Sequence, residues 1–339
     1  MPQMTAAFCT GKEKIEVSEV DVPSPGAGEV LLRVRVCGIC GSVLHFYHGA
    51  LPAMPKISPG HEFAGEIVEL GQGVSRFEVG QRVVVEPVKS CRECAYCRTG
   101  QYQLCSRRVL LGTFAPGGLA EYVCVPGYTL YALPDSLDFE LGALVEPLAV
   151  AVHGLHSVDL SMGERVLVLG SGTIGLLSVL AARAAGAGEV IATYRHEHQG
   201  LSALACGASR VLRADDIGGL EKERIDVVVE TVGGGAPTLG QALGIVRRGG
   251  RVSVLGLFTQ AVEINAFALM LSEVRIVGGI TYCRPGQHSD FDVSLRILQS
   301  EPERARAIIT HRFPLGSTAE AFATAADKSS GSLKVQVHL

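Results

Sequence analysis

Four cysteines lie close together in one short stretch of the chain, at Cys91, Cys94, Cys97 and Cys105. Four thiolates complete a tetrahedral shell around zinc and leave no open position for a substrate, as in a structural zinc site. An iron–sulfur cluster also takes four thiolates and is the chemical alternative. A disulfide framework requires an oxidising compartment, and no other feature of the chain indicates secretion. The spacing therefore predicts a structural zinc ion held on a loop.

A second set of possible metal ligands is spread along the sequence: Cys40, His61, Glu62 and Glu146. A thiolate, an imidazole and a carboxylate form a plausible catalytic zinc site, because three protein ligands leave one position for substrate. Taken singly, a buried cysteine or histidine belongs more often to a core than to a metal site. Glu146 stands in an apolar run without a cation nearby in sequence, so a metal or a polar network has to compensate its burial.

A glycine-rich turn follows an apolar strand-like run and precedes a segment rich in alanine and leucine. It reads G-x-G-x-x-G and consists of Gly170, Ser171, Gly172, Thr173, Ile174 and Gly175. The first glycine makes the turn, the second lets the backbone approach a pyrophosphate, and the third lets the helix pack closely on the strand. The N-terminus of the helix attracts the phosphates. In this setting the motif predicts a dinucleotide site.

The residue that recognises the cofactor's ribose lies about 20 residues beyond the glycines, and in an NAD site it is Asp or Glu. This chain has Tyr194 there, followed by Arg195. An arginine can bind a 2′-phosphate, and the missing carboxylate removes a repulsion against it. His196 and His198 could assist. The sequence therefore favours NADP, with NAD and a solvated Arg195 as the alternative.

The elements that hold these residues change character at about residue 161. Beyond it, strands alternate with helices, which predicts a doubly wound parallel sheet. The expected strands are 165–169, 189–193, 210–212, 225–230, 251–257 and 274–278, and the expected helices are 173–185, 197–206 and 237–246. The earlier residues form short strands between Pro and Gly turns, which predicts a β barrel or sandwich. A last helix at 291–300 and strands at 308–313 and 333–338 are expected to pack back on it.

The predicted fold class is thus α/β, with a β-rich domain at 1–152 and 282–339 and a nucleotide-binding domain at 153–281. The structural zinc lobe occupies roughly 88–108. The net charge of −4 is spread over 30 basic and 34 acidic residues without a basic stripe, so nucleic acid is not an expected partner. The N-terminus lacks the pattern of a signal peptide, and the longest apolar stretch is interrupted by glycines, so we expect no membrane span. The ten cysteines are then most simply reduced, in the cytoplasm.

Several segments together resemble the zinc-dependent medium-chain dehydrogenase/reductase superfamily. They are Gly38–Ser42, Gly60–Glu62, the four-cysteine stretch, Glu146–Leu148, the glycine-rich turn and Ile309–Leu315. The segment Glu146–Leu148 resembles the sorbitol (polyol) and threonine dehydrogenase branches. The resemblance spans the chain and implies a GroES-like catalytic domain, a Rossmann domain, a small-molecule substrate, and a homodimer or homotetramer joined through the Rossmann sheets.

The resemblance also implies roles for individual residues. Cys40 and His61 match catalytic zinc ligands, Glu62 adds a carboxylate, and Glu146 binds the metal directly or through water. Ser42 and His45 match a relay that carries the substrate's proton to water. The residues that match the substrate side are Phe46, Glu146 and Tyr282, and those expected beside the nicotinamide are Val232 and Gly233.

Three positions depart from the family pattern. Val43 stands where the family usually has an Asp that orients the zinc-bound histidine, so His61 needs another partner or binds metal less well. Phe46 replaces the Tyr, and Thr281 the Arg, of sorbitol dehydrogenases, while Tyr282 matches. With two polar substrate contacts missing, a less hydroxylated or otherwise decorated substrate than sorbitol is expected.

The sequence thus predicts a zinc-dependent oxidoreductase that transfers hydride reversibly between NADP, or NAD, and a secondary alcohol, a polyol or a sugar-derived ketone. Two alternatives remain at this point. One is an NADPH-dependent reductase of the same fold without catalytic zinc, with Val43 as the mark of its loss. The other is a non-catalytic NADP-binding protein, against which the nearly complete relay and ligand set argue.

Overall fold

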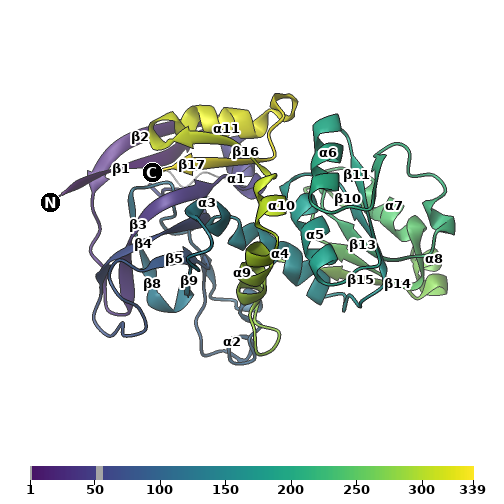
Figure 1. The fold of residues 1–339 in the computed structure, drawn as a ribbon, viewed down its shortest axis with the longest axis horizontal. Coiled ribbons are helices and arrows are strands. Elements are labelled where there is room, and N and C mark those ends of the chain that lie inside the picture. The colour runs from purple at the N-terminus through teal and green to yellow at the C-terminus, as the bar shows by residue number, and fades with distance from the viewer. Residues whose placement is uncertain (1, 51–55) are drawn as a thin grey trace. The chain divides into compact units, whose positions relative to one another are not determined.

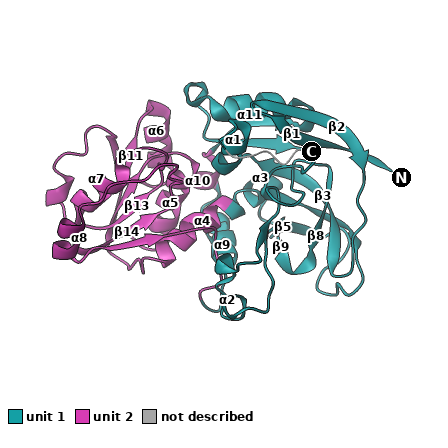
Figure 2. Cartoon of the chain, turned by 180° about the vertical axis from the view of Figure 1, so that it is seen from behind, with its two compact units in different colours: residues 1–146, 286–302, 309–339 teal, residues 147–285, 303–308 magenta. Residues whose placement is uncertain are grey.

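The computed structural model describes residues 2–50 and 56–339. The chain forms two compact units, drawn in Figures 1 and 2. Unit 1 consists of residues 1–146, 286–302 and 309–339, and unit 2 of residues 147–285 and 303–308. Within the described ranges, no helix has the length and apolar character needed to cross a membrane.

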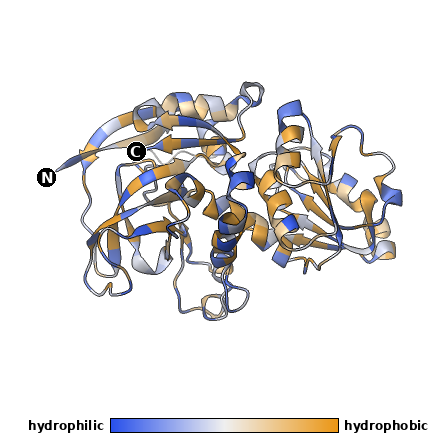
Figure 3. Ribbon diagram, viewed as in Figure 1, coloured by the Kyte–Doolittle hydropathy of each residue, from blue (hydrophilic) through white to orange (hydrophobic). Residues whose placement is uncertain are grey.

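Unit 2 is built around a parallel sheet of six strands in the order β12-β11-β10-β13-β14-β15, which is the Rossmann order and confirms the predicted doubly wound sheet. Its strands are β10 (Arg165–Leu169), β11 (Glu189–Tyr194), β12 (Arg210–Arg213), β13 (Ile225–Glu230), β14 (Val246–Val254) and β15 (Arg275–Gly278). The central strands are apolar along their length, as Figure 3 shows, because helices cover both faces of such a sheet.

The helices of this unit are α5 (Thr173–Ala184), α6 (Glu197–Ala205), α7 (Thr238–Ile245), α8 (Ala266–Ser272) and the greater part of α4 (Val145–His156). The helix α8 is absent from the sequence prediction, because its run is apolar on every side and shows no helical period. Its side chains Phe267, Met270 and Leu271 are exposed.

Unit 1 holds a sheet of seven strands, with β16-β17-β3-β4-β5-β9 in order and β8 paired to β3. Its core joins the valines and leucines of β3 to Phe63 and Ile67 of β4 and to valines of β5 and β8. The strands are β3 (Glu29–Gly38), β4 (Glu62–Leu70), β5 (Arg82–Val85), β8 (Tyr122–Pro126), β9 (Leu130–Ala132), β16 (Ile309–Pro314) and β17 (Lys334–His338). Two hairpin-like pairs accompany it, β1 (Gln3–Gly11) with β2 (Lys14–Asp21) and β6 (Val88–Lys89) with β7 (Val109–Leu110).

The helices of unit 1 are α1 (Gly41–Tyr47), α2 (Ala95–Arg98), α3 (Phe139–Gly142), α9 (Asp290–Ser300) and α11 (Thr318–Ala326). They are short, and two of them, α1 and α2, carry residues of the predicted metal sites or lie next to them. The C-terminal strands pack back as expected, since β17 pairs antiparallel with β3. Residues 303–308, expected with the first domain, instead belong to unit 2. There α10 (Pro302–Arg306) is tied to α6, because Arg304 donates to the Ala205 carbonyl.

Candidate functional site

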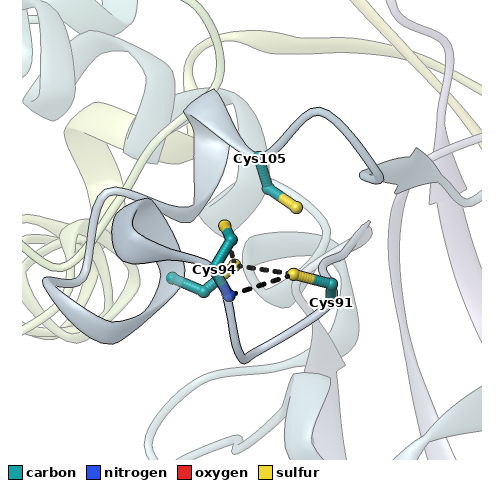
Figure 4. A group of neighbouring side chains, drawn as sticks. Cys91, Cys94 and Cys105 are labelled. Carbon is teal, nitrogen blue, oxygen red and sulfur yellow. Dashed lines mark hydrogen bonds between the residues drawn. The ribbon is translucent and has the colours of Figure 1, made fainter.

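The four-cysteine stretch folds into a compact group around helix α2. The sulfur atoms of Cys91 and Cys97 lie 3.7 Å apart, and those of Cys94 and Cys97 lie 3.5 Å apart. Zn–S bonds of about 2.3 Å place the sulfurs of a tetrahedron about 3.8 Å apart, whereas a disulfide requires about 2.05 Å. Figure 4 shows the sulfurs of Cys91, Cys94 and Cys105 directed toward the same region. The separations fit one zinc ion and are too short for sulfurs spread around a cluster of several irons.

Backbone amides prepare this group for a metal. The N–H of Cys94 donates to the Cys91 sulfur at 3.4 Å. The pKa of Cys91 is lowered to about 6, first by the N–H of Glu93 and then by that of Cys94. A metal ligand has to be a thiolate, so the turn favours the binding form of Cys91, whereas burial raises the pKa of Cys97 to about 11.

A second group of potential ligands lies at the N-terminus of α1. One ligand atom from each of Cys40, His61 and Glu62 lies within 4.8 Å of the others. Cys40 caps α1 after strand β3, and Glu62 is the first residue of β4, paired in register with Gly38 of β3. Gly38 has to be glycine, since a Cβ there would lie 2.1 Å from a Glu62 carboxylate oxygen. Sequence-distant ligands thus meet because β3 and β4 are neighbours.

Lys334 completes this group, and sequence reasoning missed it. Its ammonium donates to the two carboxylate oxygens of Glu62 at 2.7 and 2.6 Å and to the Ile39 carbonyl at 3.1 Å. Lys334 is 1% exposed and Glu62 is fully buried. Lys334 begins β17, and β17 lies next to β3 in the sheet. No local pattern could have indicated this pair, because the two residues meet only through the strand order.

Burial controls the protonation of the remaining groups. The pKa of Glu146 is raised to about 8, mainly by burial, against the pull of His61 and with added repulsion from Glu62. Burial and then Glu62 also raise the pKa of Cys40, while Lys334 and the Ser42 hydroxyl oppose the shift. Two buried carboxylates and a buried thiol call for a cation in addition to Lys334. The donor set therefore fits a zinc ion, which favours the deprotonated forms.

Valine at position 43 affects the hydrogen bonding of His61. Its Nδ1 is buried and finds no hydrogen-bond partner in the described part of the chain. Val43 is 4% exposed, packs in the apolar core of unit 1 and offers no acceptor. In the described residues, His61 Nδ1 is thus without the carboxylate partner that the family pattern places at position 43.

Helix α1 places the expected relay residues beside the ligands. The Ser42 hydroxyl donates to the Cys40 sulfur at 3.3 Å. His45 lies one turn further along the same helix and is half-buried, so the two side chains share a face. Phe46 is half-buried on the same helix and lines a small cavity with Val43 and Pro59.

The glycine-rich turn has the geometry of a dinucleotide site. Gly170 has a φ of 96°, and the Oγ1 of Thr193 accepts a hydrogen bond from its N–H at 2.9 Å. A Cβ on Gly175 would lie 1.9 Å from the Gly170 carbonyl, which enforces close packing of α5 on β10. A Cβ on Gly172 would meet no protein atom within 4 Å, so this amide faces open space. That space suits a pyrophosphate at the start of α5, where Thr173 and Ile174 lie.

The loop after β13 is shaped by a buried carboxylate. Glu230 accepts hydrogen bonds from the N–H groups of Val232 and Gly233 at 2.8 and 3.0 Å and from the Thr238 hydroxyl at 2.7 Å. Gly233 adopts a φ of 62°, and Val232 remains 42% exposed. These two residues thus lie at the carboxyl edge of the sheet, where ligands of this fold bind.

Comparison with known proteins decides the family. The family model for the alcohol dehydrogenase GroES-like domain matches residues 26–135, and that for zinc-binding dehydrogenases matches residues 173–300. The sorbitol dehydrogenase of Bacillus subtilis is 32% identical, over 100% of this chain and 98% of that protein. The chain belongs to the zinc-dependent medium-chain dehydrogenase/reductase superfamily.

Two further proteins similar to this dehydrogenase indicate its branch within the superfamily. The L-threonine 3-dehydrogenase of Pyrococcus abyssi is 38% identical over 88% of both chains. The crystal structure of a zinc-binding dehydrogenase from Sinorhizobium meliloti, bound to NADP, is similar with a TM-score of 0.90 and 31% identity over the full length of both chains. The polyol and threonine dehydrogenase-like branch that the sequence indicated is therefore confirmed.

Two positions expected near the substrate lie in unit 2. Tyr282 is fully buried. Thr281 adopts a φ of 52°, a conformation that costs a β-branched residue about 1–3 kcal/mol and is held only by its surroundings. The substrate role of Tyr282 remains a prediction.

Restoring a carboxylate at position 43 of the dehydrogenase is expected to strengthen its hold on the catalytic metal. In Val43→Asp, the new side chain supplies an acceptor for His61 Nδ1, and such partners change metal affinity about 10–100-fold. Zinc content during dialysis against a chelator measures the effect. Val43→Ala is the control that opens space without an acceptor. Equal rates of zinc loss in Val43→Asp and the native protein would count against the missing-partner argument.

Proposed function

We propose that the enzyme catalyses reversible hydride transfer between NADP and a secondary alcohol or the corresponding ketone, with NAD as the weaker cofactor. The observation that carries the proposal is the meeting of Cys40, His61 and Glu62 within 4.8 Å, at the start of the helix that bears Ser42 and His45. A redox cofactor supplies the hydride chemistry, and the protein has to orient it and handle the proton.

In the proposed site, Cys40, His61 and Glu62 hold zinc, and Glu146 lies next to them. A zinc ion held there would polarise the oxygen of the substrate and lower the pKa of its hydroxyl. Lys334 orients the Glu62 carboxylate through its two hydrogen bonds. Ser42 takes the proton from the substrate, and His45, one turn away, passes it toward water. Gly172, Thr173, Ile174, Val232 and Gly233 line the cofactor.

The substrate proposed is less hydroxylated than sorbitol. Phe46 and Thr281 offer fewer polar contacts than the Tyr and Arg of sorbitol dehydrogenases. Phe46 also faces a small cavity whose walls are mostly apolar: Cys9, Val43, Phe46, Ile57, Pro59, Gly112 and Thr113. Each unmet hydroxyl of a polyol would lose a hydrogen bond to water in such a site. A diol or an alcohol with an apolar arm fits better.

A screen of polyols, diols and sugar-derived ketones with both cofactors tests the proposal, together with zinc analysis. Turnover of a secondary alcohol with two zinc ions per chain supports it. Turnover with only one zinc ion per chain, the structural one, would favour the reductase that lacks a catalytic zinc. Tight NADP binding without turnover of any compound would favour the non-catalytic protein.

Arg195→Ala is expected to weaken NADP binding about 10–100-fold and to leave NAD binding within about twofold, because charged hydrogen bonds to a phosphate contribute about 1.5–3 kcal/mol. Arg195 is exposed at the end of β11, where the 2′-phosphate of NADP is expected. Isothermal titration of the two cofactors measures the effect. Arg248→Ala, an exposed arginine within β14, is the control. Equal losses of affinity for NADP and NAD would contradict the assignment of Arg195 to the 2′-phosphate.

A homodimer or homotetramer assembled through the Rossmann sheets completes the proposal. β15 ends the sheet with one side unpaired in the described strands, and α8, which contacts the neighbouring β14, exposes Phe267 and Met270, at 68% and 61%. An edge strand flanked by apolar side chains is a ready surface for a second copy. Phe267→Glu with Met270→Glu should give monomers in light scattering, and unchanged mass would contradict this interface. The ten free thiols support a cytoplasmic location.

A further inference from the structure

A second arginine stands beside the expected 2′-phosphate position. Arg213 is the last residue of β12 and pairs in register with Tyr194, the last residue of β11. The backbone fixes this position, because the N–H of Ala214 donates to the Tyr194 carbonyl and that of Asp216 donates to the Arg213 carbonyl. Arg213 and Arg195 therefore emerge from adjacent strands at the carboxyl edge of the sheet, where this fold binds its ligands.

The Tyr194 ring contacts the Arg213 side chain. The guanidinium of Arg213 lies 5.9 Å from the centre of the Tyr194 ring. The ring also packs so tightly on α6 that a Cβ at Gly200 would lie 2.9 Å from it. Tyr194 thus occupies the position of the usual acidic residue but serves as a platform for a cation.

Glu197 holds the same guanidinium. Its carboxylate accepts a hydrogen bond from Arg213 at 2.6 Å, and both side chains are exposed, at 72% and 52%. The Arg195 guanidinium, by contrast, pairs with no side chain in the described part of the chain. A phosphate that reaches Arg213 has to compete with Glu197, because both anions need the same planar face of donors.

We propose that Arg213 is a second specificity residue for the 2′-phosphate of NADP and that Glu197 is a competing anion that weakens this contact. The inference rests on the proposed preference for NADP. Arg195 and Arg213 bind the phosphate together, Tyr194 positions Arg213, and the Glu197 carboxylate is displaced when the phosphate binds. Glu197 thereby limits the preference for NADP over NAD.

Binding of NADP⁺, NAD⁺ and the fragment 2′,5′-ADP, measured by isothermal titration without substrate, tests the proposal. Arg213→Ala should weaken NADP⁺ and 2′,5′-ADP about 10–100-fold and leave NAD⁺ within about twofold. Arg213→Lys should recover only part of the loss, because an ammonium lacks the planar fork of donors. Glu197→Gln should strengthen NADP⁺ binding by up to about fivefold, in keeping with the small effect of an exposed ion pair.

A double variant separates this effect from a general change in the site. In the Arg213→Ala background, Glu197→Gln should no longer change NADP⁺ binding, because its partner is gone. An unchanged effect of Glu197→Gln in that background would overturn the competition. If Arg195→Ala is selective for NADP⁺ while Arg213→Ala affects both cofactors equally, the role of Arg213 is wrong and the proposed function stands. If neither arginine distinguishes the cofactors, the preference for NADP itself is wrong. Thermal unfolding of each variant confirms that it is folded.

Discussion

Lys334→Met is expected to lower the free energy of unfolding by about 3–5 kcal/mol, because it leaves the Glu62 carboxylate buried without its cation. Lys334 is 1% exposed and donates two hydrogen bonds to that carboxylate. Water therefore cannot solvate the carboxylate after the ammonium is removed. Urea denaturation followed by circular dichroism measures the change. In the wild-type enzyme Lys334 also holds the Glu62 carboxylate in position for a metal, so Lys334→Met should lose its catalytic zinc as well.

Two further variants test whether the loss of stability comes from the buried, unpaired charge. In the double variant Glu62→Gln with Lys334→Met, neither buried charge remains, so much of the stability should return. Lys14→Met is the matched surface control, because the Lys14–Glu16 pair is 64% and 50% exposed and such pairs contribute at most about 1 kcal/mol. A Lys334→Met protein with wild-type stability would mean that the buried pair is not ionic.

Cys40→Ala and His61→Ala are expected to abolish most of the activity, by about a thousandfold or more. A catalytic metal contributes several kcal/mol to transition-state stabilisation, and about 4 kcal/mol corresponds to a thousandfold in rate. Each variant should also lose one zinc ion per chain and keep the other, since the four-cysteine group is separate and closed. Initial rates and elemental analysis measure the two effects.

The chain offers a matched control for the cysteine. Cys37 lies near Cys40 and is fully buried, and burial followed by the nearby Glu62 raises its pKa well above the usual value. It is absent from the group of ligand atoms that includes Cys40. Cys37→Ala should therefore keep both zinc ions and most of the activity. Full activity in Cys40→Ala or His61→Ala would contradict the proposed site.

Much of this protein could be predicted from local sequence because its motifs are short. The spacing of Cys91, Cys94, Cys97 and Cys105 is enough to bring four sulfurs together, since a turn and one short helix close the group. The geometry of the glycine-rich turn is also local, because Gly170 makes the turn and Gly175 allows close packing within one strand–turn–helix unit. Ser42 and His45 share a helical face by their spacing alone.

The tertiary structure decided what no spacing encodes. Glu62 meets Lys334 because β17 and β4 flank β3 in one sheet, and strand order depends on packing of the entire unit. The unpartnered nitrogen of His61 and the pairing of Arg213 with Glu197 likewise depend on which elements become neighbours. Short-range geometry follows from covalent distance along the chain, whereas a buried charge finds its partner only after the core has formed around both.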